Sequence, residues 1–276
     1  MNFSPDAFRP APDANKYTRG KLTVIAGSAR YPGAAALAAR ASQRMGAGYT
    51  EVITAREAVD VVRIASPSLV VRAFDDWDVE ELPATKEGKP CAVCIGPGFV
   101  NDAESAALVL RVLKKAQCPV LIDGGGLAGL GSAKALKRLA KRADLGFATV
   151  ITPHGGEAAR LAKSLGLPVD SPEQLAMDLS KALHAIVALK GPDTQVADGD
   201  RIEAMREGTA ALAKAGTGDV LAGMIGALLA QGVEPFEAAL AGAWFHAKAG
   251  VAAAERLTDI SVCAEDVIEA IPDVLK

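Results

Sequence analysis

Short apolar runs recur along the chain, and each is followed by a longer segment rich in alanine. Runs of this kind are typical of strands that are buried on both faces of a sheet. The expected strands are "KLTVIAG", "YTEVIT", "CAVCIG", "PVLID", "FATVIT" and the neighbouring pair "HAIVALKG" and "TQVADGD". Strands that alternate with helices indicate a mostly parallel sheet with helices on both faces. The sequence therefore predicts the α/β class and a three-layer fold.

The expected helices lie between these strands, at 33–45, 56–65, 102–115, 132–142 and 157–165, and long helices close the chain. The polar stretch 75–90 is expected to be a surface loop. Because no linker is long or polar enough to divide the chain, residues 1–276 are expected to form one domain. Residues 1–20 are expected to form an irregular arm.

Charge and composition exclude several functional classes. The net charge is −3 and aromatic residues make up 4% of the chain, which argues against nucleic acid or an anionic membrane surface as a partner. No apolar run reaches 18 residues, so no membrane span is expected. The first residues contain acids and prolines rather than an apolar signal segment. We therefore expect a cytoplasmic protein.

Four cysteines occur, at positions 91, 94, 118 and 263. Cys91 and Cys94 have the spacing of a redox or zinc motif, but they lie inside an apolar run and no second pair completes a zinc site. Side chains three residues apart in a strand point to opposite faces. The two thiols are therefore expected to be buried, free and unable to meet.

Glycine-rich turns follow most of the expected strands. They are "AGSARYPGAA", "IGPGFV", "IDGGGLAGL", "TPHGGEA", "LKGPDT" and "AGTGD". Ligands of open parallel sheets bind at the carboxyl ends of the strands, and glycine lets a backbone approach a ligand closely. Together the six turns predict a ligand-binding edge.

The turn at 216–219 runs directly into an apolar helix. The start of a helix has unpaired backbone N–H groups and positive dipole, so Gly216, Thr217 and Gly218 could present these groups to a phosphate. Asp219 has two interpretations. It could stabilise the first turn of the helix, or it could act as a general base toward a hydroxyl that attacks a phosphoryl group.

The motifs resemble those of a known family. "AGTGDVLAG" is similar to the catalytic signature of ribokinase-like kinases, and from about Tyr17 onward the chain resembles the ADP/ATP-dependent NAD(P)H-hydrate dehydratases. The combination of "TPHGGE", "LKGPDT" and "GTGDVLAG", in that order, carries the resemblance. It implies a ribokinase-like fold and a repair enzyme that phosphorylates the ring hydroxyl of hydrated NADH or NADPH, with ADP or ATP and Mg²⁺. Loss of phosphate then regenerates NAD(P)H. A homo-oligomer, a tetramer or larger, is also implied.

The resemblance also implies roles for individual residues. It makes Asp219 the base, and Gly216, Thr217 and Gly218 the anion hole. The adenine nucleotide is expected at Lys190, Gly191, Pro192, Asp193, Thr194 and Gly218. The hydrated dinucleotide is expected at Ala34, Gly98, Asp123, His154 and Asp219. Glu157 matches an acid that organises Mg²⁺ through water, although it could simply cap its helix. His246 is expected to serve packing or an interface, and His184 to lie on the surface.

Two departures from the family pattern lie near these residues: Gly125 replaces a second acid after Asp123, and Thr209 replaces an asparagine. We expect them to weaken substrate affinity before nucleotide binding. One rival interpretation is a kinase of hydroxymethylpyrimidine or hydroxyethylthiazole, which shares the fold and anion hole. Another is a nucleotide-binding protein without turnover. The choices between ADP and ATP, and between NADH and NADPH hydrate, remain open at this stage.

Overall fold

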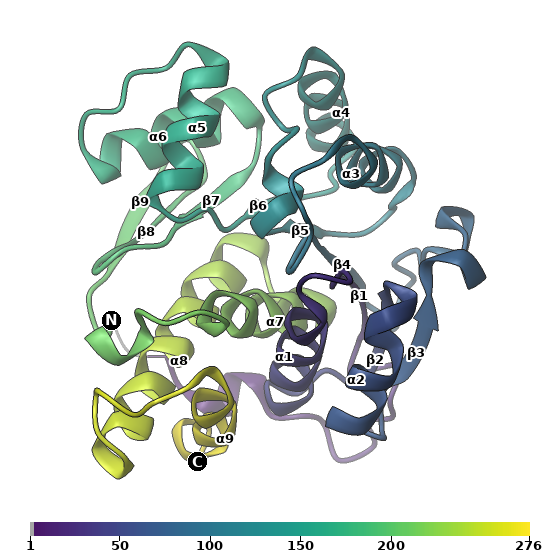
Figure 1. Cartoon of the computed structure of the whole chain (residues 1–276), viewed down its shortest axis with the longest axis vertical. Helices are drawn as coiled ribbons and strands as arrows, with labels where there is room; N and C mark the ends of the chain where they lie inside the picture. The colour runs from purple at the N-terminus through teal and green to yellow at the C-terminus, as the bar shows by residue number, and fades with distance from the viewer. Residues whose placement is uncertain (1–2) are drawn as a thin grey trace.

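The computed structural model describes residues 3–276, and within this range nine strands form one sheet (Figure 1). The strand order is β3-β2-β1-β4-β5-β6-β7-β8-β9. The strands are β1 Lys21–Ile25, β2 Tyr49–Thr54, β3 Val70–Ala73, β4 Cys91–Ile95, β5 Val120–Ile122, β6 Thr149–Ile151, β7 Ile186–Leu189, β8 Thr194–Ala197 and β9 Ile202–Met205. The pairs from β3 to β7 are parallel, whereas β8 and β9 pair antiparallel. The predicted mostly parallel sheet is confirmed.

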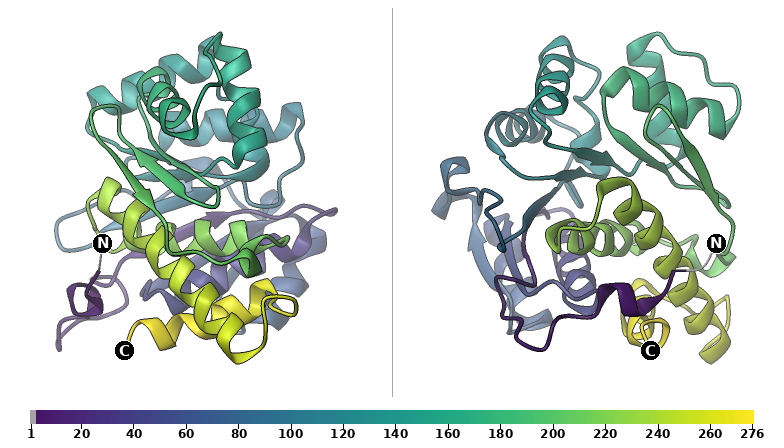
Figure 2. Two further views of the ribbon diagram at one scale, coloured as in Figure 1. Left: turned by 90° about the vertical axis from the view of Figure 1, so that its left-hand side faces the viewer. Right: turned by 180° about the vertical axis from the view of Figure 1, so that it is seen from behind.

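Helices cover both faces of the sheet (Figure 2). They are α1 Pro32–Arg44, α2 Val59–Ala65, α3 Ala103–Lys115, α4 Ala133–Asp144, α5 Gly155–Leu165, α6 Pro172–Leu183, α7 Thr217–Ala230, α8 Pro235–Arg256 and α9 Ala264–Val274. One hydrophobic core joins the sheet to α1, α2, α7, α8 and α9, and a second joins it to α3, α4, α5 and α6. This arrangement is the predicted three-layer fold. None of these helices combines the length and the apolar composition that a bilayer crossing requires.

Residues 3–20, most of the expected arm, contain a 3-10 helix at Pro5–Phe8 and several turns. Phe8 packs edge-on against Phe245 of α8, with ring centroids 5.6 Å apart. Met1 and Asn2, the first residues of that arm, lie outside the described residues. The polar stretch 75–90 is largely exposed and contains only short 3-10 turns and isolated bridges.

Three elements were missing from the sequence prediction: β3, α6 and β9. β3 and β9 are the two edges of the sheet, and each exposes part of its length. An edge strand needs no continuous apolar run, so the criterion that found the buried strands misses it. α6 carried the usual signals of a helix start, with Ser171 as the N-cap and Pro172 in the first turn.

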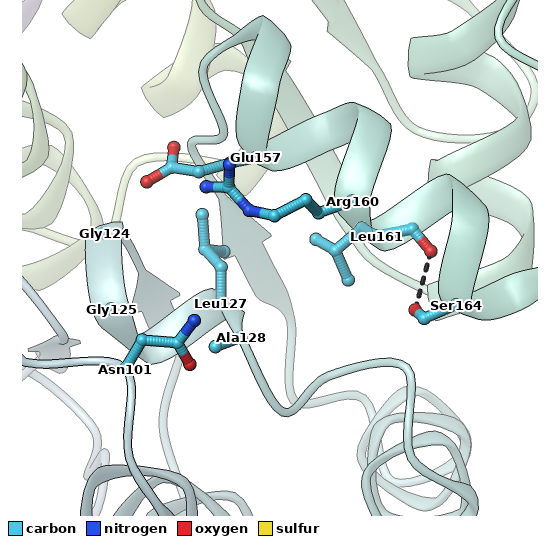
Figure 3. A pocket seen from close by; sticks show the side chains of 9 residues that line it. All are labelled: Asn101, Gly124, Gly125, Leu127, Ala128, Glu157, Arg160, Leu161 and Ser164. Atoms are coloured by element: carbon cyan, nitrogen blue, oxygen red, sulfur yellow. Dashed lines mark hydrogen bonds between the residues drawn. The ribbon is translucent and has the colours of Figure 1, made fainter.

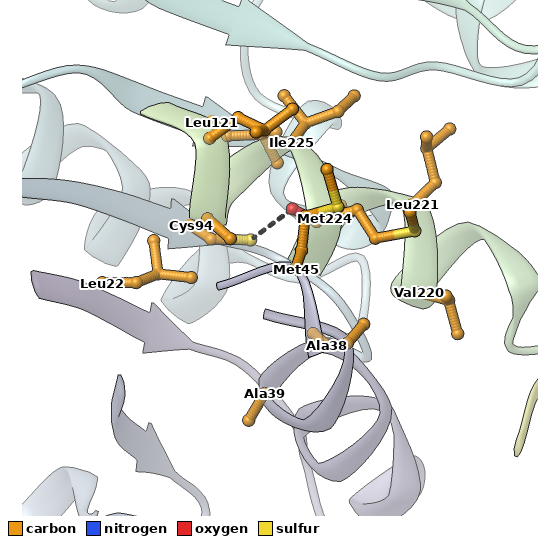
Figure 4. Close-up of a cluster of buried hydrophobic side chains, with 14 of the residues drawn as sticks. Leu22, Ala38, Ala39, Met45, Cys94, Leu121, Val220, Leu221, Met224 and Ile225 are labelled. Atoms are coloured by element: carbon orange, nitrogen blue, oxygen red, sulfur yellow. Dashed lines mark hydrogen bonds between the residues drawn. The ribbon is translucent and has the colours of Figure 1, made fainter. Parts of the chain in front are cut away.

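Cys91 and Cys94 lie on opposite faces of β4, as the strand geometry predicts. The Cys94 thiol packs against α7 and lies 3.9 Å from the carbonyl oxygen of Ala222 (Figure 4). Cys91 belongs to the core on the other face of the sheet, as does Cys118. All three thiols are free and buried. His246 is buried in α8, and His184 is exposed, as expected, in a left-handed conformation at the end of α6.

The close packing of α1 against α7 fixes the position of the turn at 216–219, which leads into α7. α7 is buried on nearly all sides, and it contacts both α1 and the centre of the sheet (Figure 4). A Cβ added at Gly223 would lie 2.1 Å from the carbonyl oxygen of Ala38. Only glycine therefore lets the two helix backbones come this close. The start of α7, with Asp219, is held in place by this packing.

We predict that Gly223→Val destabilises the fold by about 1–3 kcal/mol, the usual cost of overpacking a filled core. The added methyl groups would force α7 away from α1. Urea unfolding would measure the loss. Gly155→Ala is the matched control because a Cβ at Gly155 would have no neighbour within 4 Å. Equal stability of the valine variant and the wild type would show that the contact is not tight.

Candidate active site

The predicted substrate residues Ala34 and Gly98 meet at the carboxyl edge of the sheet. Gly98 has φ of +69°, and a Cβ there would lie 2.6 Å from the Cβ of Ala34. Ser28 fixes the same contact, since its hydroxyl donates a 2.7 Å hydrogen bond to the carbonyl oxygen of Gly98. The turns after β1 and β4 therefore form one surface. Ser28 was not singled out in the sequence, although it lies within the first glycine-rich turn.

A buried ion pair joins two residues that the sequence assigned to different ligands. The Lys190 ammonium donates to Oδ1 of Asp123 at 2.7 Å, and the Thr152 hydroxyl donates to the same oxygen at 2.6 Å. Asp123 is 3% exposed. Although burial lowers the pKa of Lys190, the attraction of Asp123 raises it above its ordinary value. Lys190 therefore carries its charge at the point where β5, β6 and β7 end.

The turn before α7 forms a backbone cradle. Gly216 has φ of +93°, and a Cβ there would lie 2.8 Å from Cδ1 of Leu37. The Thr217 hydroxyl donates to the carbonyl oxygens of Leu212 and Lys214, at 2.7 and 2.9 Å. Because that hydroxyl is already engaged, backbone N–H groups are the donors that this turn can offer to an anion, and of these the Thr217 N–H makes a long 3.5 Å contact with the carbonyl oxygen of Lys214. A Cβ at Gly218 would lie 3.3 Å from Nζ of Lys190, so the lysine stands directly over this cradle.

Asp219 is a carboxyl group with a strongly displaced pKa. Burial, together with the nearby Asp123 and Glu157 carboxylates, raises the pKa to about 7 against the opposing effect of Lys190. A carboxyl group with a pKa near neutrality can accept a proton and release it under physiological conditions. An acid that serves only to stabilise the first turn of a helix is usually solvated, whereas Asp219 is half-buried.

His154 and Glu157 cap the start of α5. The His154 N–H donates to Oε2 of Glu157 at 2.8 Å, and Nδ1 of His154 accepts from the Gly156 N–H at 3.0 Å. Glu157 therefore caps its helix, as one of its two interpretations predicted, because it accepts a hydrogen bond from the His154 backbone N–H. The same carboxylate also acts on the pKa values of Lys190 and Asp219. It faces the site as well as its own helix.

The expected nucleotide segment forms the connection between β7 and β8. Lys190 is partly buried, Gly191, Pro192 and Asp193 are exposed, and Thr194 opens β8. His154 and Lys190 form an isolated parallel bridge, so this segment begins beside the start of α5. The structure thus brings the expected nucleotide segment, the ion pair and the cradle together at one place.

The glycines after Asp123 are explained by backbone packing. They form a short 3-10 helix, Gly124–Leu127, and a Cβ at Gly125 would lie 2.3 Å from the carbonyl oxygen of Phe99. An acid at this position would require the loop to move. The space beside it is a cavity of about 150 Å³, into which Arg160 extends from α5 (Figure 3). Arg160 was not predicted from the sequence.

Thr209 holds the loop that precedes the cradle. Its hydroxyl donates to Oδ1 of Asp259 at 2.7 Å and accepts from the Ala211 N–H at 3.2 Å. Lys214, further along the same loop, reaches the carbonyl oxygen of Ile260. The loop is therefore tied to the connection between α8 and α9. Nothing in these contacts places Thr209 against a ligand.

The chain also matches proteins of known family in sequence. The sequence profile described as NAD(P)H-hydrate dehydratase matches residues 22–273. The chain belongs to the NAD(P)H-hydrate dehydratase family. It is 34% identical to the ADP-dependent (S)-NAD(P)H-hydrate dehydratase of Xanthomonas campestris, over 96% of this chain and 91% of that protein. It is also 38% identical to the bifunctional NAD(P)H-hydrate repair enzyme of Gloeobacter violaceus, over 93% of this chain. The chain spans about half of that longer relative, 49% of its length.

Solved structures of similar proteins identify the fold of this chain. An ADP/ATP-dependent NAD(P)H-hydrate dehydratase from Bacillus subtilis, co-crystallised with ATP/Mg²⁺, superposes with a TM-score of 0.81 at 26% identity, covering 99% of this chain and 98% of that one. A ribokinase from Thermotoga maritima has a TM-score of 0.56 at 14% identity. The ribokinase-like fold is confirmed. A hydroxyethylthiazole kinase from Pyrococcus horikoshii shares the fold alone, with a TM-score of 0.58 at 20% identity.

We predict that Asp219→Asn stabilises the protein at high pH. The carboxyl pKa is about 7 in the folded state against an ordinary 3.8, so the charged form is disfavoured by folding. The wild-type penalty, on the order of 1.4 kcal/mol for each displaced unit, is complete above pH 7 and disappears as the pH falls toward 4. Thermal unfolding at pH 8 should give the variant the higher melting temperature, and the difference should vanish near pH 4.

The control for this experiment is Asp170→Asn, which removes an exposed carboxylate in the loop before α6. Its melting temperature should follow the wild type at every pH. If Asp219→Asn instead lowers the melting temperature at pH 8, the Asp219 carboxylate is a net stabilising partner of Lys190, and the assigned displacement is wrong.

Proposed function

We propose that this protein restores NADH or NADPH from its hydrate, using ADP or ATP as phosphoryl donor, in a reaction centred on Asp219. The observation that carries the proposal is the meeting of three groups at one edge of the sheet. These are a base with a pKa of about 7, a backbone cradle at the start of α7 and a partly buried lysine over that cradle. Family membership supplies the substrate class, since the similar proteins are named for it.

The proposed reaction has two steps. In the first, Asp219 takes the proton of the ring hydroxyl, the hydroxyl oxygen bonds to the terminal phosphorus, and the bond between that phosphorus and the nucleotide breaks. The N–H groups of Gly216, Thr217 and Gly218 would hold the transferred group, and Lys190 would offset its charge. In the second, the ring C–O bond breaks, phosphate leaves, and a proton is lost from the adjacent carbon as the double bond returns.

The chain's donors fit a Mg²⁺ ion that nucleotide and water largely hold. Within residues 3–276 no group of three or more histidine, cysteine or acidic side chains could hold a metal ion. Mg²⁺ is commonly bound by one or two carboxylates together with phosphates and several waters. Glu157, whose side chain is 13% exposed and faces Lys190 and Asp219, is the carboxylate that would hold it through water. When bound, the ion would neutralise negative charge on the phosphates.

The remaining site residues follow from the same arrangement. We assign the nucleotide to the segment Lys190, Gly191, Pro192, Asp193 and Thr194, and the ring of the substrate to the surface formed by Ala34 and Gly98, with Asp123 and His154 alongside. We further propose a cytoplasmic homo-oligomer, a tetramer or larger, with ADP as the favoured donor. The family resemblance supports the assembly, and three buried free thiols suit a reducing cytosol.

The decisive experiment is recovery of absorbance at 340 nm from purified NADH hydrate and NADPH hydrate. Recovery should require both Mg²⁺ and an adenine nucleotide with a transferable phosphate, and omission of either should abolish it. Hydroxymethylpyrimidine and hydroxyethylthiazole serve as competing acceptors. Phosphorylation of either, with both hydrates untouched, would replace this function with the vitamin-precursor kinase. Nucleotide binding with no turnover of any acceptor would favour a binding protein.

We predict that Asp219→Asn lowers kcat for hydrate repair by about 10²- to 10⁴-fold, the range for loss of a general base. Nucleotide affinity should be nearly unchanged, because Lys190 and the segment after it remain. In the wild type, kcat/KM should rise with pH up to about 7 and then level, as Asp219 loses its proton. The same acid limb should disappear in the variant. If Asp219→Asn turned over the hydrates at nearly the wild-type rate, Asp219 would not be the general base.

A further inference from the structure

A second and larger pocket lies along the same edge of the sheet as the proposed active site. Its volume is about 620 Å³, within the range of small-molecule sites. It opens where β1, β2, β3 and β4 end, and the N-terminal part of α3, as far as Arg111, forms its other wall. None of the roles assigned above uses it. The pocket is large enough for a small molecule and lies beside the proposed active site.

The pocket is continuous with the surface proposed for the substrate ring. Gly27 and Ser28, which line it, belong to the turn that leads to Ala34, and Phe99 directly follows Gly98. The hydrogen bond from Ser28 to the Gly98 carbonyl oxygen forms the boundary between the two spaces. By contrast, the nucleotide segment lies beyond β7, with β5 and β6 in between. The pocket therefore adjoins the acceptor and not the phosphoryl donor.

Aromatic side chains form one part of the pocket lining. Phe74 and Phe99 stand edge to face, with ring centroids 6.1 Å apart, and Trp77 is half-buried beside them. Such a set of rings offers a flat, planar group both stacking and edge contacts. Aromatic residues make up only 4% of this chain, so three of them in one pocket are a concentrated feature. The chemistry suits a purine base.

The rim of the pocket carries surplus negative charge. Four carboxylates line it, those of Glu57, Asp75, Asp102 and Glu104, against the two guanidinium groups of Arg56 and Arg111. Both arginines already have acidic partners: Arg56 pairs with Asp75 and Asp76, and Arg111 with Asp78.

Glu57 and Glu104 are exposed, and among residues 3–276 neither forms an ion pair. Free carboxylates accept hydrogen bonds from ribose hydroxyls and repel a phosphate group at the same position. The rim therefore favours a ribose with both hydroxyls free.

We propose that this pocket binds the adenosine half of the hydrated dinucleotide and makes the enzyme selective for NADH hydrate over NADPH hydrate. The inference rests on the proposed function. The adenine lies among Phe74, Trp77 and Phe99, and the adenosine ribose faces Glu57 and Glu104. The extra 2′-phosphate of NADPH hydrate would meet those carboxylates and no unpaired cation of the lining. The dinucleotide then extends along the sheet edge, from Asp219 to the end of β3.

The first test compares the two hydrates. Wild-type kcat/KM should be at least about tenfold higher for NADH hydrate, by the like-charge argument above. The double variant Glu57→Gln with Glu104→Gln should bring the two values within about threefold of each other, through a lower KM for NADPH hydrate and an unchanged kcat. The matched control is Glu173→Gln with Glu255→Gln, which removes two exposed carboxylates outside the pocket and should keep the wild-type ratio.

The second test uses a truncated substrate, the hydrate of reduced nicotinamide mononucleotide, which lacks the adenosine half. Trp77→Ala should raise KM for NADH hydrate by about tenfold, because base stacking on an aromatic ring contributes about 1–3 kcal/mol. It should leave the constants for the mononucleotide hydrate unchanged. Trp77→Phe, which keeps a ring, should retain most of the affinity for the dinucleotide.

The outcomes separate this inference from the proposed function. If wild-type enzyme repairs neither hydrate, the proposed function fails and the pocket assignment fails with it. If both hydrates are repaired but Trp77→Ala weakens the mononucleotide and dinucleotide hydrates equally, Trp77 only supports the fold and the pocket assignment is wrong. Equal kcat/KM for the two dinucleotides in the wild type would overturn the selectivity.

Discussion

The ion pair between Lys190 and Asp123 joins the carboxyl ends of β5 and β7 across β6, and Thr152, at the end of β6, donates to the same carboxylate oxygen. Three neighbouring strands thus share one buried polar contact. Such a pair is costly to break from either side, because an unpaired buried charge would remain. It holds a positive charge over the start of α7 and a negative charge close enough to raise the pKa of Asp219.

The position of α7 brings the backbone cradle and Asp219 next to this polar contact. The helix is buried and contacts α1 through backbone that only glycine permits, so its first turn has little freedom to move. A rigid cradle with fixed N–H groups needs no reorganisation when charge develops on a transferred group. The same packing leaves Asp219 half-buried, and within residues 3–276 its side chain has no hydrogen-bond or ion-pair partner. The charged form of Asp219 is therefore disfavoured in the folded protein at neutral pH.

The sheet edge divides into two halves with different chemistry. Beyond β5 lie the ion pair, the cradle and the exposed segment proposed for the nucleotide. On the other half, the ends of β1 to β4 carry the contact of Ala34 with Gly98 and the aromatic pocket with its acidic rim. A dinucleotide acceptor and a nucleotide donor both need an extended surface and must meet at one point. The strand order provides this, because the chain changes direction along the sheet between β1 and β4.

The sequence by itself determined the sheet, most of the helices and the set of glycine turns, because these depend on local patterns of apolar residues and on backbone conformations that glycine adopts. It also determined the family. It missed both edge strands, whose exposed residues break the apolar pattern. Only the tertiary structure joined Lys190 to Asp123, residues 67 positions apart that the motifs had given to different ligands. The pKa of Asp219 and the pocket around Trp77 were likewise decided by burial and by neighbours distant in sequence, which no local pattern encodes.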